Sequence, residues 1–200
     1  YYGRALRMHH FLGESGRVWG YDPFDMAGYL SGPFLEVGTH LLALSAHALS
    51  PVMPLGRSML FIETAGLALA PFLVLLAVRV AGGSRYQAWS AFAFTIPLYG
   101  FVDPFSATMV RVGLWGFMMA SFAAPLQVAL AWRWLATGSA ASAVGVVGVS
   151  AALFGLHPAA LIVVAVPNLL LFAVMARHAG ARRVVITLLL VALVLAANFY

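Results

Sequence analysis

The stretch SMLFIETAGLALAPFLVLLAV, residues 58–78, decides the fold of this chain. It contains a single charged residue, Glu63. About 20 apolar residues, with a range of about 17–25, are needed to cross the roughly 30 Å hydrocarbon layer of a bilayer. Because no water is available inside lipid to bond the backbone, such a segment must be helical. We therefore predict that this stretch forms a transmembrane helix.

Further apolar runs follow the first one, which brings the number of predicted spans to six. The alternation of polar and apolar residues that a membrane β-barrel requires is absent from these runs. The sequence therefore predicts an all-α fold, a polytopic bundle of six short transmembrane helices. The additional runs lie at about residues 86–101, 112–134, 140–156, 158–176 and 183–199.

The composition agrees with a lipid environment. Hydrophobic residues make up 63% of the chain and charged residues 8%, whereas a soluble domain carries about 25% charged residues. We therefore expect the lipid bilayer to be the main partner. The absence of cysteine excludes disulfides and thiolate metal sites. The basic residues are all arginine and are scattered singly, so nucleic acid is not an expected partner.

The distribution of arginine predicts the orientation in the membrane. Alternate loops are rich in arginine and contain no acid. The opposite short loops, 101–111 and 157–158, contain a single arginine, Arg111. Because arginine-rich loops stay in the cytoplasm, residues 1–57 are expected to be extracytoplasmic. The absence of lysine is typical of a GC-rich bacterial genome, so we expect a multi-pass protein of the bacterial cytoplasmic (inner) membrane. The arginine-rich loops are 79–85, 133–139 and 177–183.

Two domains are predicted. Residues 1–57 form an extracytoplasmic loop, irregular up to residue 32 and followed by an amphipathic helix at 33–50 that lies along the membrane interface. Residues 58–200 form the transmembrane bundle. Because the chain does not begin with Met, we interpret it as an internal fragment of a longer protein. One face of the amphipathic helix would carry Glu36, His40 and His47.

The segment WGYDPFDMAGY, residues 19–29, carries the densest cluster of chemically useful side chains. Asp22 and Asp25 could share one divalent cation, or one could act as a base that the other orients. Trp19 and Tyr21 could stack on a sugar ring. In the alternative reading, Asp22 begins a turn with the proline that follows it, and Asp25 caps a short helix.

This segment resembles the first large external loop of GT-C-type membrane glycosyltransferases. Within that group it is most similar to bacterial predicted membrane glycosyltransferases with a W-x-Y-D-P-x-x-M-A-G-Y-like loop. The resemblance implies a polyprenyl-phosphate-linked sugar as donor, an external catalytic carboxylate, and a divalent cation, Mg²⁺ or Mn²⁺. Asp22 would then be the catalytic or metal-binding acid and Asp25 its catalytic neighbour.

Three further residues are candidates for the same site. Asp103, in a second Asp-Pro-Phe sequence, would be the second catalytic and metal-binding acid that many GT-C enzymes have. Arg111 suits a lipid phosphate, which a guanidinium binds with two hydrogen bonds. Glu63 lies within a span, where acids are costly and often functional; it could bind substrate or pair with Arg57 or Arg111. In the alternative reading, Asp103 belongs to an ordinary turn, and Arg111 and Glu63 have structural roles near the membrane interface.

The remaining polar residues are weaker candidates. The adjacent His9 and His10 are a poor metal site, because neighbouring side chains rarely point the same way. Asn168 is expected to bond the backbone that Pro167 frees in the middle of a span. Two other functions stay open: a non-catalytic membrane subunit or scaffold of a larger complex, and, ranked last, a transporter or flippase.

Overall fold

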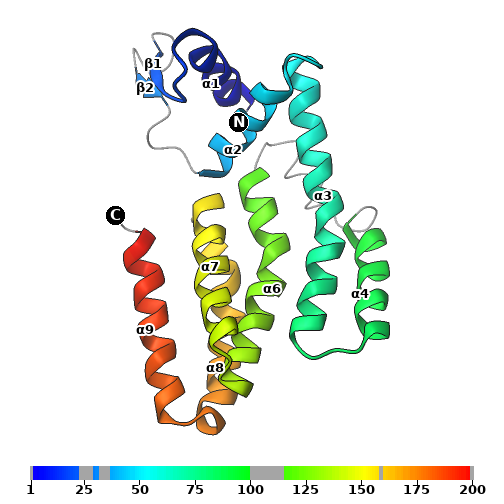
Figure 1. The fold of residues 1–200 in the computed structure, drawn as a ribbon, viewed down its shortest axis with the longest axis vertical. Coiled ribbons are helices and arrows are strands. Elements are labelled where there is room, and N and C mark those ends of the chain that lie inside the picture. Colours follow the sequence, from blue (N-terminus) through cyan, green and yellow to red (C-terminus); the bar gives the residue numbers. More distant parts are fainter. Residues whose placement is uncertain (1, 23–28, 32–36, 100–114, 158–159, 199–200) are drawn as a thin grey trace.

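The computed structural model describes residues 2–22, 29–31, 37–99, 115–157 and 160–198, and most of these residues are helical. The long helices run along a common direction, and a smaller N-terminal unit lies over one of their ends (Figure 1). The bundle consists of α3 (Leu55–Val80), α4 (Arg85–Pro97), α6 (Trp115–Thr137), α7 (Ala140–Leu156), α8 (Ala160–Ala179) and α9 (Ala181–Asn198).

Within the described residues, three helices are long and apolar enough to cross a membrane: Leu55–Val80, Trp115–Thr137 and Ile162–Ala179. The chain is therefore a helical membrane protein, but with fewer such helices than the six predicted. α4 has 13 residues and α7 has 17, which makes them about 20 and about 26 Å long against a hydrocarbon layer of roughly 30 Å. The prediction was too high because it counted short apolar runs as spans. The run 140–156, for example, forms a helix with these bounds, Ala140–Leu156.

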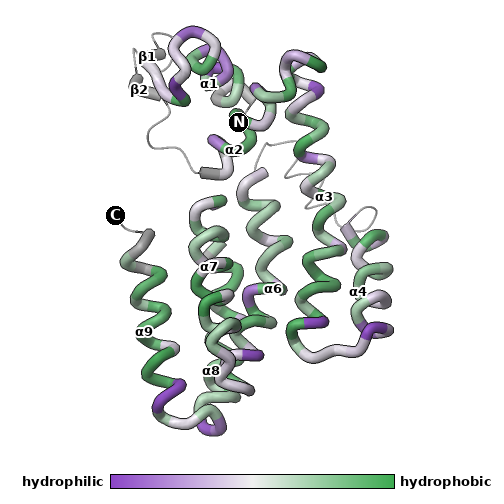
Figure 2. Tube along the Cα trace, in the orientation of Figure 1, coloured by the Kyte–Doolittle hydropathy of each residue, from purple (hydrophilic) through white to green (hydrophobic). Residues whose placement is uncertain are grey.

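Successive bundle helices alternate in direction, so their connections gather at two opposite ends (Figure 1). One end, here the N-terminal end, holds the starts of α3 and α6 and the end of α7, beside the N-terminal unit. The other, here the arginine end, holds the turns α3–α4, α6–α7 and α8–α9, and Figure 2 shows hydrophilic segments at or beside each of them. The three arginine-rich loops of the sequence thus lie together. Their basic residues are Arg79, Arg85, Arg133, Arg177, Arg182 and Arg183.

Arginines at this end bind the free carbonyls with which helices terminate. The last four carbonyls of a helix have no partner in their own helix and carry the negative end of its dipole. Arg183 of α9 donates from Nη1 to the carbonyls of Leu135 and Ala136 at the end of α6, at 2.9 and 3.2 Å. Arg133 of α6 donates to the carbonyl of Val80, the last residue of α3, at 3.4 Å. These contacts connect α9 to α6 and α6 to α3.

Local sequence signals also fix the turns at the arginine end. Gly82, Gly138 and Gly180 follow the ends of three helices with φ of 94, 71 and 79°, which glycine adopts without the strain that a Cβ would cause. α4 begins with a capping box, in which the backbone N–H of Gln87 donates to Ser84 Oγ at 3.2 Å and that of Ser84 to Gln87 Oε1 at 2.7 Å. The turns themselves are thus fixed by residues close to one another in the sequence.

A chain of polar side chains crosses the bundle interior. Asn168 Nδ2 of α8 donates to Gln127 Oε1 of α6 at 2.7 Å, and Gln127 Nε2 donates to Ser150 Oγ of α7 at 3.2 Å. Gln127 and Ser150 are buried. The Asn168 side chain therefore bonds to another helix and not, as expected, to the backbone that Pro167 frees. Hydrogen bonds of this kind hold membrane helices together in a set register.

The N-terminal unit comprises α1 (Tyr2–Ser15), β1 (Gly20–Asp22), β2 (Tyr29–Ser31) and α2 (Val37–Leu49). The strands pair antiparallel, with Gly20 opposite Ser31 and Asp22 opposite Tyr29. The prediction that residues up to 32 are irregular was therefore wrong, and the all-α description needs this small sheet added. The fully buried side chains of α1 and α2 belong to one apolar cluster that also includes residues of α3 and α6: Ala5, Met8, Leu42, Ala43 and Ala46.

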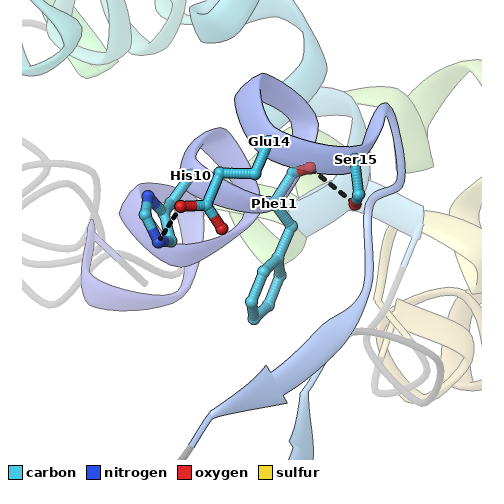
Figure 3. A network of polar contacts seen from close by, with 4 residues as sticks. All are labelled: His10, Phe11, Glu14 and Ser15. Atoms are coloured by element: carbon cyan, nitrogen blue, oxygen red, sulfur yellow. Dashed lines mark hydrogen bonds and ion pairs between the residues drawn. The ribbon is translucent and has the colours of Figure 1, made fainter.

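Helix α1 ends within one turn of the sheet. Ser15 Oγ donates to the carbonyl of Phe11 at 2.9 Å, as Figure 3 shows. The next residue, Gly16, has φ of 68° and reverses the chain. The ring of Phe11 then covers Gly20 of β1, where a Cβ would lie only 2.6 Å from a ring carbon. Glycine at this position allows helix and strand to come into contact.

Two glycines attach the N-terminal unit to the bundle. A Cβ on Gly38 of α2 would lie 2.7 Å from the carbonyl oxygen of Leu156, the last residue of α7, and 3.1 Å from the Cα of Gly116. A Cβ on Gly116 of α6 would also collide with the Leu156 oxygen. The backbones of three helices therefore meet directly at this point, which fixes α2 across the tops of α6 and α7.

Candidate functional site at the N-terminal end

The small sheet determines where the predicted acidic cluster lies. Tyr21 and Asp22 are the last two residues of β1, and their backbones pair with Leu30 and Tyr29 of β2. The chain between the strands contains Asp25, which lies outside the described residues. Asp22 is therefore the final strand residue before the connection, and β1 is held against α1 through the contact of Phe11 with Gly20.

Trp19 stands at the start of this sheet and is 42% exposed. The guanidinium carbon of Arg17 lies 5.2 Å from the centre of its ring, which is a cation–π contact. A large aromatic surface beside a fixed positive charge is suited to a sugar ring that carries a phosphate. The sequence predicted Trp19 as a substrate-binding residue and did not predict Arg17.

Glu63 lies inside the bundle and does not face lipid. Its residue is 9% exposed and belongs to the buried stripe of α3, together with Met59, Gly66 and Ala70. Within the described part of the chain, no ion pair joins Glu63 to Arg57, and the alternative partner Arg111 lies outside that part. A buried carboxyl group raises the free energy of the folded protein unless it is well compensated. This makes Glu63 a functional candidate.

Helix α6, which packs against α3, contributes a buried hydrogen-bond donor that the sequence did not suggest. Trp115 begins α6, is 9% exposed, and its Nε1 is buried without a hydrogen-bond acceptor among the described residues. A Cβ on Gly66, one turn after Glu63, would lie 3.2 Å from Trp115 Nε1 and 2.6 Å from Met119 Sδ. The close approach of α3 and α6 at Gly66 thus places the indole against the same stripe of α3. No local sequence pattern distinguishes such a donor from an anchoring tryptophan.

The remaining predicted site residues, Asp25, Asp103 and Arg111, lie outside the residues that the structure describes. Of the others, the β1 strand with Tyr21 and Asp22, the exposed Trp19 and the first half of α3 all belong to the N-terminal end of the molecule (Figure 1). No group of three or more metal-ligating side chains is found among the described residues. The predicted site for Mg²⁺ or Mn²⁺ is not tested by this, because two of its three acids lie outside them.

The structure pairs histidines in a way that the sequence did not predict. His9 of α1 faces His47 of α2, with their Nδ1 atoms 3.0 Å apart. His10 points to a different partner: its Nε2 lies 3.2 Å from Glu14 Oε1, one turn along α1 (Figure 3). His9 and His10 therefore have different partners, as expected for two histidines that do not share one site. His157, after α7, stacks edge-on against Phe117 of α6.

No protein-family model matches the chain, and neither a curated protein nor a solved structure is similar to it at a significant level.

Proposed function

We propose that this chain belongs to a GT-C-like integral membrane glycosyltransferase of the bacterial inner membrane, which transfers a sugar from a polyprenyl-phosphate donor to an extracytoplasmic acceptor. One observation carries the proposal. The β1 strand that contains Asp22, the exposed Trp19 and the half of α3 that contains Glu63 lie at the end of the bundle opposite the arginine end. This is the arrangement that a site open to the extracytoplasmic side requires.

The reaction needs three functions from the protein. A base must take the proton of the acceptor hydroxyl as it attacks the sugar, and Asp22 with its neighbour Asp25 is proposed for this role. The departing lipid phosphate must be stabilised, which Arg111 would do through two charge-assisted hydrogen bonds. A divalent cation held by Asp22 and Asp103 would neutralise the same phosphate.

The substrate must also be held in place. Trp19 and Tyr21 would stack on the sugar, with the charge of Arg17 fixed beside the Trp19 ring. Glu63 would accept hydrogen bonds from sugar hydroxyls, and the indole N–H of Trp115 would donate one to an oxygen of the same substrate. Buried polar groups gain most when a substrate provides the partners that the protein does not.

The experiment is a binding titration with a defined probe. The whole chain, in lipid nanodiscs with Mn²⁺, is titrated with undecaprenyl phosphate, and tryptophan fluorescence and native mass spectrometry report binding. We expect saturable binding of one lipid per chain, weakened about tenfold or more in Arg111→Gln, which is about 1.4 kcal/mol. Glu14→Gln, an acid exposed on α1, is the control and should bind as the wild type.

The two other candidate functions predict different results. A non-catalytic subunit would show no preference for undecaprenyl phosphate over ordinary phospholipid, and that result would overturn the proposal. A transporter or flippase would bind the lipid but would also move it between leaflets. If the lipid binds, sugar transfer from the polyprenyl-phosphate-linked donor is measured next, and Asp22→Asn should abolish it.

A further inference from the structure

Two imidazole rings meet across the α1–α2 contact of the N-terminal unit. His9 and His47 are 38 residues apart in the sequence, and their Nδ1 atoms are separated by 3.0 Å. The ring centres are 4.9 Å apart and the ring planes are inclined by 59°. The rings therefore meet through their nitrogens, and are not stacked face to face.

The positions of both rings are set by the packing beneath them. Met8, next to His9, and Ala46, next to His47, are fully buried and belong to one apolar cluster. Both histidines are partly exposed, at the edge of this apolar contact. The backbone of each histidine is thus held by a buried apolar neighbour, while solvent can reach the two imidazole rings.

The chemistry of two facing Nδ1 atoms is restrictive. A neutral imidazole has one N–H and one nitrogen lone pair. When two Nδ1 atoms face each other, they can share one proton, or both lone pairs can bind one metal ion. Zinc–nitrogen bonds are about 2.0–2.1 Å long, so two of them at a tetrahedral angle hold their nitrogens about 3.3 Å apart. The observed separation needs to grow by only a few tenths of an ångström.

We propose that His9 and His47 form a two-histidine site for a divalent transition-metal ion of the zinc class, held between α1 and α2. Imidazole nitrogen favours Zn²⁺, Ni²⁺ and Cu²⁺, whereas Mg²⁺ and Ca²⁺ prefer oxygen. The site is thus distinct in chemistry from the carboxylate site for Mg²⁺ or Mn²⁺ that the resemblance implies. Water, which can reach both partly exposed imidazoles, would complete the coordination.

Metal binding at this point has a structural consequence. One ion would connect α1, which is followed directly by the β1–β2 sheet, to α2, which is fixed on the bundle through Gly38. Because an ion that binds only the folded protein stabilises it by mass action, the N-terminal unit should resist unfolding more strongly with the metal than without it. This inference does not depend on the proposed glycosyltransferase activity.

The test uses the whole chain in nanodiscs, purified through a tag that contains no histidine and stripped with EDTA. Isothermal titration with ZnCl₂ measures affinity and stoichiometry, and the visible spectrum after addition of CoCl₂ reports tetrahedral coordination. We expect one ion per chain at micromolar concentrations. His9→Ala and His47→Ala should each weaken binding about tenfold or more, by analogy with the effect of losing even an outer-shell partner.

His10→Ala is the matched control, because His10 is adjacent to His9 but pairs with Glu14. It should bind Zn²⁺ as the wild type does. Failure of the wild type to bind Zn²⁺ or Co²⁺ at micromolar concentrations would overturn the proposal, whatever the variants do. Equal binding by wild type, His9→Ala and His47→Ala would overturn it as well. Should the alanine variants unfold, His9→Gln and His47→Gln, which keep a polar group at each position, replace them.

Discussion

The polar side chains at the two ends of the bundle differ in their hydrogen-bond partners. At the arginine end, described basic side chains donate to backbone carbonyls: Arg183 to the end of α6 and Arg133 to the end of α3. At the N-terminal end, Glu63 is buried without an ion pair to a described base, and Trp115 Nε1 is buried without a described acceptor. One end uses its polar groups to stabilise the fold, whereas these two polar groups of the other end have no such bond among the described residues.

The glycine junction at the N-terminal end should show the largest effect on stability. In Gly116→Ala, the new Cβ meets the backbone oxygen of Leu156, which cannot move without displacing the end of α7. We expect a loss of about 2–3 kcal/mol, the usual effect of forcing extra volume into a packed contact. Unfolding in a titration with SDS, followed by circular dichroism, measures it.

Gly148→Ala on α7 is the matched control for this substitution. A Cβ at Gly148 meets nothing within 4 Å, and alanine favours helix over glycine by about 1 kcal/mol. The control should therefore be as stable as the wild type or more so. Equal losses in the two variants would show that the three backbones do not meet as described.

At the arginine end, Arg183→Gln should remove the two charge-assisted bonds to the carbonyls of α6. Hydrogen bonds to charged groups contribute about 1.5–3 kcal/mol each, less where water competes; we expect about 1.5 kcal/mol in total. The neighbouring Arg182 is exposed, so Arg182→Gln should change the free energy of unfolding by less than about 0.5 kcal/mol. Equal effects would mean that only net charge matters at this end.

These two ends also differ in how far the sequence could predict them. The spans α3, α6 and α8, the arginine-rich turns and their common side follow from length, composition and arginine placement, which are local properties. α1 was missed because its buried residues, Ala5 and Met8, are too few to mark a helix among polar neighbours. They become informative only when Leu42, Ala43 and Ala46 of α2 cover them.

The candidate site shows the same limit. Glu63 was predicted because one acid in an apolar span is conspicuous by itself. The unpartnered indole of Trp115 and the facing nitrogens of His9 and His47 depend on contacts between distant segments. For the same reason, Asn168 was assigned to its own backbone, whereas its partner is Gln127 on another helix.

The polar chain inside the bundle should show a smaller effect. Gln127→Leu removes bonds to both Asn168 and Ser150. Interhelical hydrogen bonds in membrane proteins contribute about 0.6 kcal/mol on average and at most about 1.7, so we expect a loss of about 1 kcal/mol. A double-mutant cycle with Asn168→Leu should give a coupling energy of about 0.6 kcal/mol. Additive effects in that cycle would show that the two amides do not interact.

The smallest effect on stability is expected from Glu63→Gln. Because a buried carboxyl group without a compensating charge does not stabilise the fold, the free energy of unfolding should stay within about 1 kcal/mol of the wild type or rise. Binding of undecaprenyl-phosphate-linked sugar should weaken in the same variant. A large loss of stability would show instead that Glu63 is structural, like the arginines of the opposite end.

The most direct measurement asks whether the two ends lie on opposite sides of a membrane. The chain contains no cysteine, so Gly13→Cys on α1 and Ala81→Cys after α3, both at exposed positions, introduce single labelling sites. Cells that express each variant are treated with a membrane-impermeant maleimide before and after permeabilisation. We expect Gly13→Cys to be labelled in intact cells and Ala81→Cys to be labelled only after permeabilisation. Labelling of both positions from the same side would contradict it.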